Sequence, residues 1–232
     1  MVDVALPILV QQMIDSDWFR VITILGTVAF ALSGVVLAYA GGYTLIGAFV
    51  VAALPAAGGG VARDPLLQRQ PLAIVRDSAI LLAIIGTVLL GKALFRFAAL
   101  IGAQNSLQLG RCGAQVIEFC DALGLGVFII IGVVTALDAS AYPLWLWGPV
   151  SAIITTSFGR LMRDVMCRDQ EIAKGRSEFY PEIALIWGLA LSLFLGWEAH
   201  RLQPAEIRLI VIGTVVCAFV TRMVVVKVDL KG

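Results

Sequence analysis

The sequence predicts an all-α integral membrane protein, with seven transmembrane helices arranged as two inverted three-helix repeats plus a C-terminal helix. Of the 232 residues, 60% are hydrophobic and 14% are charged, whereas soluble domains carry about 25% charged residues. The apolar residues form long runs, and one glycine-containing pattern recurs about 100 residues later. At about 20 residues per crossing, the chain has room for roughly six to eight spans. We therefore expect a single transmembrane domain over residues 1–232.

Each expected helix is an apolar run of span length between polar or Gly/Pro-marked segments. Several boundaries carry a recognisable signal: Asp77 precedes the third run, Asp138 ends the fourth, and Pro204 precedes the seventh. The expected helices cover approximately residues 18–40, 43–63, 78–98, 116–137, 144–163, 180–199 and 206–226.

The basic residues are distributed unevenly between the two sides that seven spans define. Six of the 17 Lys and Arg residues lie near the side of the N-terminus, and the remaining eleven lie near the other side. Cytoplasmic loops of membrane proteins are enriched in Lys and Arg. We therefore expect a multi-pass protein of the cell (inner) membrane, with its N-terminus outside and its C-terminus in the cytoplasm.

An internal repeat predicts how the helices are arranged. Its matching positions are 98 residues apart early in the pattern and 100 apart late in it. A three-helix unit enters the membrane from opposite sides at its two occurrences, so the copies are related by a pseudo-two-fold axis in the membrane plane. Repeat one spans about 18–98, and repeat two about 116–199. The matched residues are Gly26, Phe30, Gly34, Arg63 and Asp64 in the first copy and Gly124, Phe128, Gly132, Arg163 and Asp164 in the second.

The second helix of each repeat contains residues that favour a kink or an unwound turn. Proline removes a backbone donor and glycine frees the backbone, and paired breaks in two halves indicate a permeation or binding site. Close helix packing through small residues is the alternative. The candidate residues are Pro55, Gly58, Gly59 and Gly60 in the first half and Pro149, Thr155, Thr156, Ser157 and Gly159 in the second.

Ionisable residues follow each of these segments. Arg63-Asp64 and Arg163-Asp164 occupy corresponding positions, and Arg160 lies one turn before Arg163. Charges at membrane depth usually face a bundle interior or an aqueous cavity and are paired. We expect Glu118 and Asp121, at the start of the fourth helix, to pair with Arg160 or Arg163. The alternative is a set of interfacial ion pairs with arginines extending toward the headgroups.

Two further basic residues, Lys92 and Arg96, lie one turn apart near the end of the third helix. They could contact anionic headgroups of membrane lipid, but the sequence favours solvated charges at a helix end.

Several function classes are excluded at this stage. The net charge is only +1, which argues against a nucleic-acid partner. The four cysteines form no CxxC pair and the chain has one histidine, so no metal site is expected. No GxSxG, HExxH or Walker motif is present. We therefore expect neither an enzyme nor a cofactor.

The segment Gly58-Gly59-Gly60-Val-Ala-Arg63-Asp64 resembles the signature of a known family. With its span count and repeat, the chain resembles bacterial members of the trimeric intracellular cation (TRIC) channel family. The resemblance implies a homotrimer in which each protomer has its own pore for potassium or other monovalent cations. It further implies that the second and fifth helices line the pore. The second copy departs from the motif, since Phe158 and Arg160 stand where glycines are expected.

Three function classes remain open. The first is a monovalent cation (potassium) channel with a pore in each protomer. The second is a secondary transporter of a small zwitterionic solute such as an amino acid, because both classes use broken helices in inverted repeats. The third is a structural membrane protein, which leaves the buried arginine unexplained. The sequence favours the channel.

Overall fold

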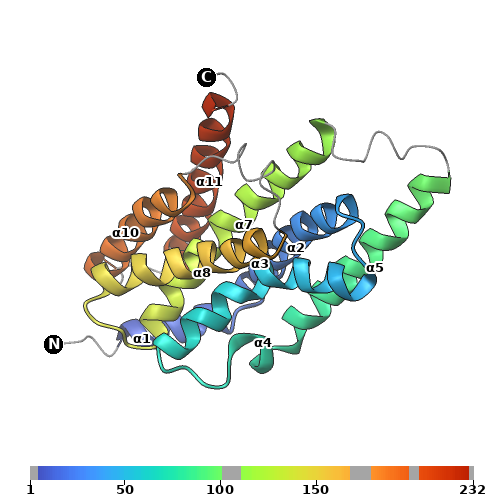
Figure 1. Ribbon diagram of the computed structural model, residues 1–232. Helices are drawn as coiled ribbons and strands as arrows, with labels where there is room; N and C mark the ends of the chain where they lie inside the picture. The colour runs from blue at the N-terminus through green and yellow to red at the C-terminus, as the bar shows by residue number, and fades with distance from the viewer. Residues whose placement is uncertain (1–4, 101–110, 168–178, 199–203, 230–232) are drawn as a thin grey trace.

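The computed structural model describes residues 5–100, 111–167, 179–198 and 204–229, and the regular structure in this part is helical (Figure 1). This confirms the all-α class. The helices are α1 (Ala5–Ile14), α2 (Asp17–Ala40), α3 (Leu45–Leu66), α4 (Ala73–Arg76), α5 (Ser78–Leu100), α7 (Arg111–Asp138), α8 (Leu144–Cys167), α10 (Tyr180–Glu198) and α11 (Pro204–Asp229).

Six of these helices, α2, α3, α5, α7, α10 and α11, are long and apolar enough to cross a membrane. The chain is therefore an integral membrane protein. Helix α8, the expected fifth span, has 24 residues but is more polar, with Arg160, Arg163 and Asp164 in its second half. Helices α3, α7 and α10 pack against it, so protein rather than lipid covers Arg160 and Arg163. The count of seven spans remains a prediction.

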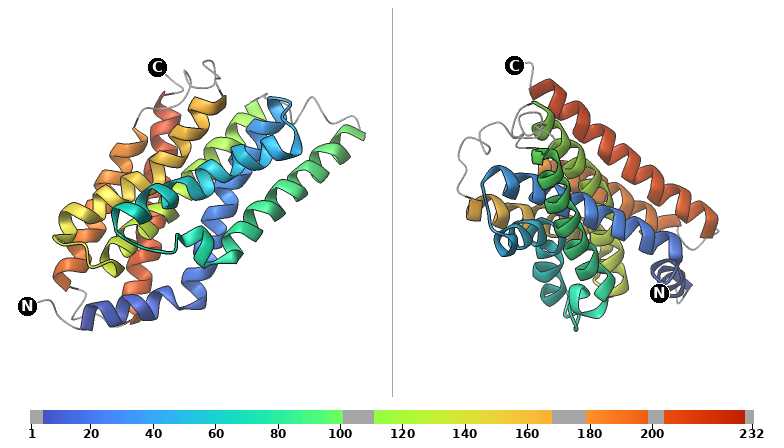
Figure 2. Two further views of the ribbon diagram at one scale, coloured as in Figure 1. Left: turned by 60° about the horizontal axis from the view of Figure 1, so that its bottom comes forward. Right: turned by 90° about the vertical axis from the view of Figure 1, so that its right-hand side faces the viewer.

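Two helices were not expected from the sequence. Helix α1 lies at an angle to α2 and packs against α7 and α2 (Figure 2). Helix α4 is a single turn between α3 and α5. Both are short relative to the spans, and neither gives a long apolar run.

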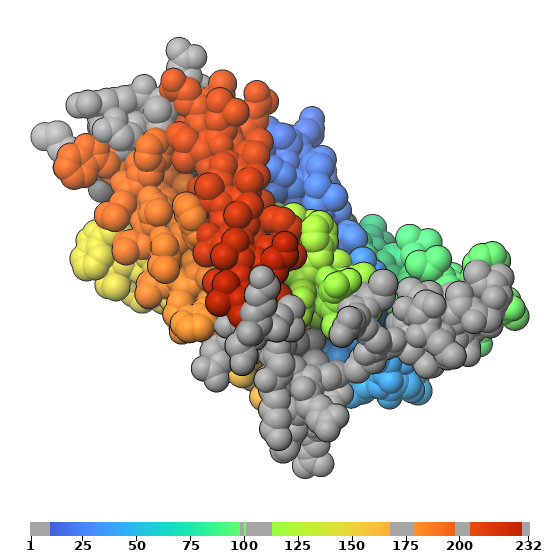
Figure 3. Space-filling model, turned by 90° about the horizontal axis from the view of Figure 1, so that it is seen from above, coloured from blue at the N-terminus to red at the C-terminus, as the bar shows by residue number. Residues whose placement is uncertain are grey.

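Helices α3 and α8 lie side by side (Figures 1 and 2). Helix α2 packs against α3, α7 packs against α8, and α2 and α7 contact each other. Each contact within the first three spans has a counterpart in the second three: α2–α3 with α7–α8, α2–α5 with α7–α10, and α3–α5 with α8–α10. Helix α11 packs on α7 and α10, away from α5 (Figure 3). Below, the first end is the end of the bundle where α2 begins, and the second end is the opposite one.

Residues of the sequence repeat form close contacts in the core. A methyl group added to Gly34 would lie 2.6 Å from the Ala52 Cα, and one added to Gly132 would lie 2.5 Å from the Ala152 Cα. These gaps admit no side chain, so the first two helices of each half touch through their backbones, as small residues permit in membranes. Between the halves, the rings of Phe30 on α2 and Phe128 on α7 pack with centroids 4.8 Å apart.

Candidate functional site

Glycines form the crossing of α3 and α8, the most extensive helix contact in the described part of the chain. A methyl group on Gly59 would overlap the backbone carbonyl oxygen of Thr155, and one on Gly159 would overlap the carbonyl oxygen of Leu54. One on Gly58 would lie 3.0 Å from the Gly159 Cα. The two helices therefore meet backbone to backbone at this level.

Both helices run through their proline and glycine positions without a non-helical residue. No unwound break accompanies Pro55 in α3 or Pro149 in α8, because neighbouring helices can support a proline-containing transmembrane helix. The glycines of the crossing are in close backbone contact, the geometry expected of the packing role that the sequence left open as the alternative. Gly60 differs from them, because a methyl group there would have as its nearest neighbour Arg63 Nη2 at 3.8 Å.

Arg63 and Asp64 lie in the last turn of α3, at the first end of the bundle. They are 2% and 1% exposed. The Arg63 guanidinium donates to Asp64 Oδ1 through Nε at 3.0 Å and through Nη2 at 2.7 Å, and Nη1 donates to Thr155 Oγ1 at 3.3 Å. Asp64 Oδ2 accepts the backbone N–H of Ala73 at 2.7 Å. The charge pair thus joins α3 to α8 and to the start of α4.

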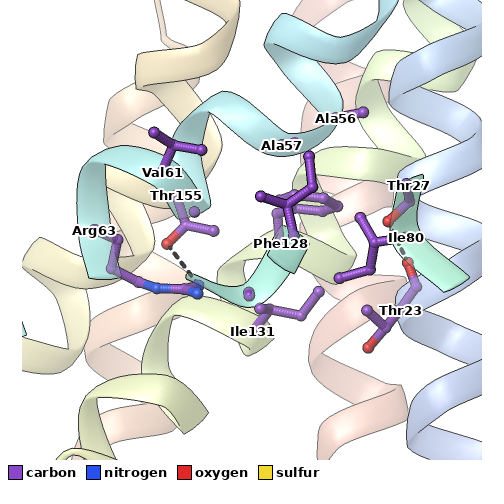
Figure 4. A pocket seen from close by; sticks show the side chains of 13 residues that line it. Thr23, Thr27, Ala56, Ala57, Val61, Arg63, Ile80, Phe128, Ile131 and Thr155 are labelled. Atoms are coloured by element: carbon purple, nitrogen blue, oxygen red, sulfur yellow. Dashed lines mark hydrogen bonds between the residues drawn. The ribbon is translucent and has the colours of Figure 1, made fainter. Parts of the chain in front are cut away.

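A cavity of about 40 Å³ lies beside this pair, between α2, α3, α5, α7 and α8. The charged side chain in its lining is Arg63, and three hydroxyl groups accompany it. Figure 4 shows Arg63 and Thr155 on one side and Thr23 and Thr27 on the other, with Phe128 between them. The cavity therefore presents a guanidinium opposite a pair of hydroxyl groups.

The two threonines of α2 have free acceptor capacity. Thr23 donates its hydroxyl proton to the Phe19 carbonyl and Thr27 donates to the Thr23 carbonyl, both at 2.9 Å. A hydroxyl that donates to its own helix keeps oxygen lone pairs for a second partner. In the cavity, Arg63 supplies donors and the threonines supply acceptors.

The predicted hydroxyl run of α8 divides by role. Thr155 lines the cavity and accepts from Arg63. Thr156 is buried and donates to the Ala152 carbonyl at 2.8 Å, and the half-buried Ser157 lies 3.4 Å from its hydroxyl. Thr155 is thus the member of the run that the structure places at the cavity.

A second polar cluster lies toward the second end. Arg163 is 0% exposed and donates to Ser33 Oγ and to Asp164 Oδ1, each at 3.0 Å. Asp121 on α7 lies 3.6 Å from the Arg163 guanidinium and 3.7 Å from that of Arg160. Asp121 is therefore close to both arginines, as the sequence suggested.

Two further positions complete this region. Glu118 is half-buried one turn before Asp121 on α7, and it has an interaction of its own. Arg160 also approaches Asp164 at 3.7 Å. Arg160 is paired within protein, and this arrangement favours a bracing role over a free charge in a pore.

Sequence reasoning missed the aromatic centre of this cluster. The guanidinium of Arg160 lies 4.3 Å from the ring centroid of Tyr180, and that of Arg222 on α11 lies 5.2 Å from it. The Tyr180 hydroxyl donates to the Asp121 carbonyl at 3.2 Å. Arg222 could have been found from the sequence, because it is a charged residue inside the last apolar run. For Thr23 and Thr27, the signal was a pair of hydroxyl residues one turn apart in a span.

The fold is that of bacterial TRIC cation channels. A TRIC orthologue from Rhodobacter sphaeroides superposes with a TM-score of 0.70 at 23% identity, covering 91% of this chain and 98% of that one. A prokaryotic TRIC channel in 0.5 M KCl gives a TM-score of 0.70 at 21% identity, covering 91% and 97%. The resemblance noted from the sequence is confirmed at the level of the fold.

Sequence comparison defines the family. A family model described as "Glycine transporter" matches residues 20–96 and 118–196. A UPF0126 membrane protein of Vibrio cholerae is 31% identical over 194 residues, 82% of this chain and 74% of that one. The UPF0126 inner membrane protein YadS of Escherichia coli is 33% identical over 166 residues, 72% and 73% of the two chains. The chain belongs to this glycine transporter family.

Proposed function

We propose that the chain moves a small zwitterionic amino acid, with glycine as the first candidate, through the region where α2, α3, α7 and α8 meet. The observation that carries the proposal is the cavity in which Arg63 lies opposite Thr23 and Thr27. A guanidinium pairs with carboxylates, and hydroxyl oxygens accept hydrogen bonds from an ammonium group. The family description names glycine, which carries these two groups at its ends.

The α3–α8 crossing supports a carrier that closes on one side of its solute. Gly159 and Leu54 meet further toward the second end than the cavity, in backbone contact. A carrier needs a site that is exposed to one side at a time, whereas a channel needs a continuous polar path. The contact between Gly59 and Thr155 would be part of the closed barrier.

A monovalent cation channel, with potassium as its main ion, is the second candidate. The TRIC fold supports it, and in that case the glycine crossing is a shut gate in the pore of each protomer. We place it second because the charged group lining the cavity is Arg63, which is paired with Asp64 and offers hydrogen-bond donors rather than the oxygen acceptors that a bare cation needs.

Further features belong to the same proposal. We propose seven spans in two inverted repeats, which the family match supports because its second stretch begins 98 residues and ends 100 residues after the first. We propose a homotrimer, in line with the trimeric description of the Rhodobacter channel orthologue. The N-terminus is placed outside and the C-terminus in the cytoplasm, on the distribution of the 17 basic residues. No enzymatic activity is proposed.

Transport into liposomes distinguishes the two candidates. Purified protein is reconstituted, and uptake of labelled glycine and flux of potassium are measured on the same vesicles. A carrier gives saturable glycine uptake and negligible potassium flux. Potassium flux that rises linearly with its gradient, without glycine uptake, would reject the carrier in favour of the channel.

Removal of the cavity hydroxyls tests the site itself. Thr23→Val combined with Thr27→Val keeps the side-chain shape and removes both acceptors, so we expect at least tenfold weaker half-saturation for glycine, equivalent to about 1.4 kcal/mol. Thr87→Val is the matched control, because Thr87 donates to its own helix at 2.7 Å and lies on α5 outside the cavity. Equal half-saturation in both variants would remove the cavity from the transport path.

A further inference from the structure

A larger cavity lies toward the second end, between α2, α5 and the start of α3. Its volume is about 220 Å³, well above the roughly 10–15 Å³ that one water molecule requires. Two basic side chains, Lys92 and Arg96, line it together with a wall of apolar and aromatic groups. It shares no lining residue with the Arg63 cavity.

Lys92 and Arg96 have no hydrogen-bond or ion-pair partner among the described residues. Lys92 is half-buried and Arg96 is exposed, one turn apart on α5. The hydrogen bonds and ion pairs found for the described residues include none made by either side chain. Lys92 lies 14 positions after Ser78, about 21 Å along the helix at 1.5 Å per residue. If α5 enters the membrane at Ser78, the Lys92 Cα therefore lies within the roughly 30 Å hydrocarbon thickness, where an unpaired charge is costly.

The rest of the cavity wall is apolar. Val35 and Val88 are buried beside it, and the rings of Tyr39 and Phe95 stack with centroids 4.0 Å apart and planes at 10°. A soluble anion would gain little from these surfaces, whereas an acyl chain or glycerol backbone would bury apolar area against them.

The cavity lies at the outside of the bundle, where α5 forms part of its wall. Helix α5 lies at its edge, opposite α11 (Figures 1 and 3). The outward face of α5 carries exposed apolar residues, with Leu90 74% and Leu94 62% exposed. A lipid can therefore reach Lys92 and Arg96 along this face without passing through the protein core.

We propose that this cavity binds one anionic phospholipid, whose phosphate pairs with Lys92 and Arg96 and whose glycerol and first acyl carbons pack against Val35, Val88 and the Tyr39–Phe95 stack. Phosphate accepts hydrogen bonds from both ammonium and guanidinium groups, and anionic headgroups attract basic residues at the membrane surface. The bound lipid supplies the counter-charge that the described part of the chain does not provide.

Native mass spectrometry of the full chain in mild detergent tests the proposal. The protein is titrated with phosphatidylglycerol and with phosphatidylcholine of the same acyl chains. We expect one phosphatidylglycerol to remain bound at least tenfold more tightly than phosphatidylcholine. The double variant Lys92→Gln, Arg96→Gln should lose this preference. Lys227→Gln should keep it, because it neutralises an exposed lysine on α11 that lies at the same end of the bundle but outside the cavity.

A second variant separates the two halves of the binding site. Ala48→Leu adds bulk at the cavity wall and leaves both cations in place, so it should weaken phosphatidylglycerol binding as well. The proposal is overturned if both variants bind phosphatidylglycerol as the wild type does, or if the two lipids bind equally. Displacement of the lipid by equimolar inorganic phosphate would identify a free-anion site instead and would also overturn it. The readout does not depend on transport.

Discussion

The contact at Gly59 allows a graded test of the α3–α8 crossing by alanine substitution. Gly59→Ala would place a methyl group in overlap with the Thr155 carbonyl oxygen and 2.6 Å from its carbon. Gly58→Ala would meet the Gly159 Cα at 3.0 Å, and Gly86→Ala on α5 would meet nothing within 4 Å. The three variants make the same chemical change in helices and differ in the space available.

The expected effects follow from these distances. Ordinary contact begins at 3.4 Å, so the Thr155 carbonyl carbon alone requires a separation of about 0.8 Å between the backbones at Gly59. Overpacking of this kind destabilises by about 1–3 kcal/mol. At Gly86 the helix gains about 0.5–1 kcal/mol from the replacement of glycine. The melting temperatures should therefore rank Gly86→Ala highest, Gly58→Ala next and Gly59→Ala lowest.

Thermal unfolding followed by tryptophan fluorescence in detergent gives this ranking, and flux measurements on the same preparations test its functional meaning. If the crossing is a closed barrier, Gly59→Ala should also raise the leak of small solutes, because the closed arrangement is the one that it disfavours. Identical melting temperatures for Gly59→Ala and Gly86→Ala would refute the reasoning. A lower melting temperature without a change in leak would leave the contact as packing alone.

Three further predictions concern charge. Asp121→Asn should lower the free energy of unfolding by about 3–5 kcal/mol, because it leaves Arg160 and Arg163 without a central carboxylate. Asp164→Asn should lower it by about 1 kcal/mol or less, because that side chain is 29% exposed. Equal losses in the two variants on thermal unfolding would contradict this prediction. Arg160→Ala should lower the melting temperature without raising potassium flux, since the arginine is a brace; higher flux with intact protein would make it a pore charge. A reporter that is active only in the cytoplasm should be active when fused after Gly232. Activity of a reporter that works only outside the cytoplasm would reverse the proposed orientation.

The sequence predicted the positions of the long helices well, because apolar runs of this length have few alternatives in a chain of such composition. The repeat also marked Gly34 and Gly132, and the structure shows that both pack on alanine backbones in the core. The pairing of Asp121 with the arginines of α8 followed from their depth. These features depend on the spacing of apolar and charged residues and on the repeat, both of which can be read directly from the sequence.

Other features depend on three-dimensional packing and were not accessible. Whether a proline or glycine unwinds a helix or only lets a neighbour approach is decided by the facing helix, and around Gly59 the facing backbone of α8 is in contact. Thr23 and Thr27 became candidates only when α2 was seen to face Arg63 across a cavity. Arg222 lies outside both repeats, so pseudosymmetry gave no reason to bring it to Tyr180.

The carboxylate of Asp64 connects the buried guanidinium to a surface segment, since one oxygen accepts from Arg63 and the other from the Ala73 N–H. A ligand that draws Arg63 toward itself must therefore compete with Asp64, whose other oxygen holds the start of α4. Val75 on this turn is 69% exposed and lies outside the cavity lining. An environment-sensitive dye on a cysteine introduced at this position would then report occupancy of the membrane interior from the water phase, leaving every cavity residue unlabelled.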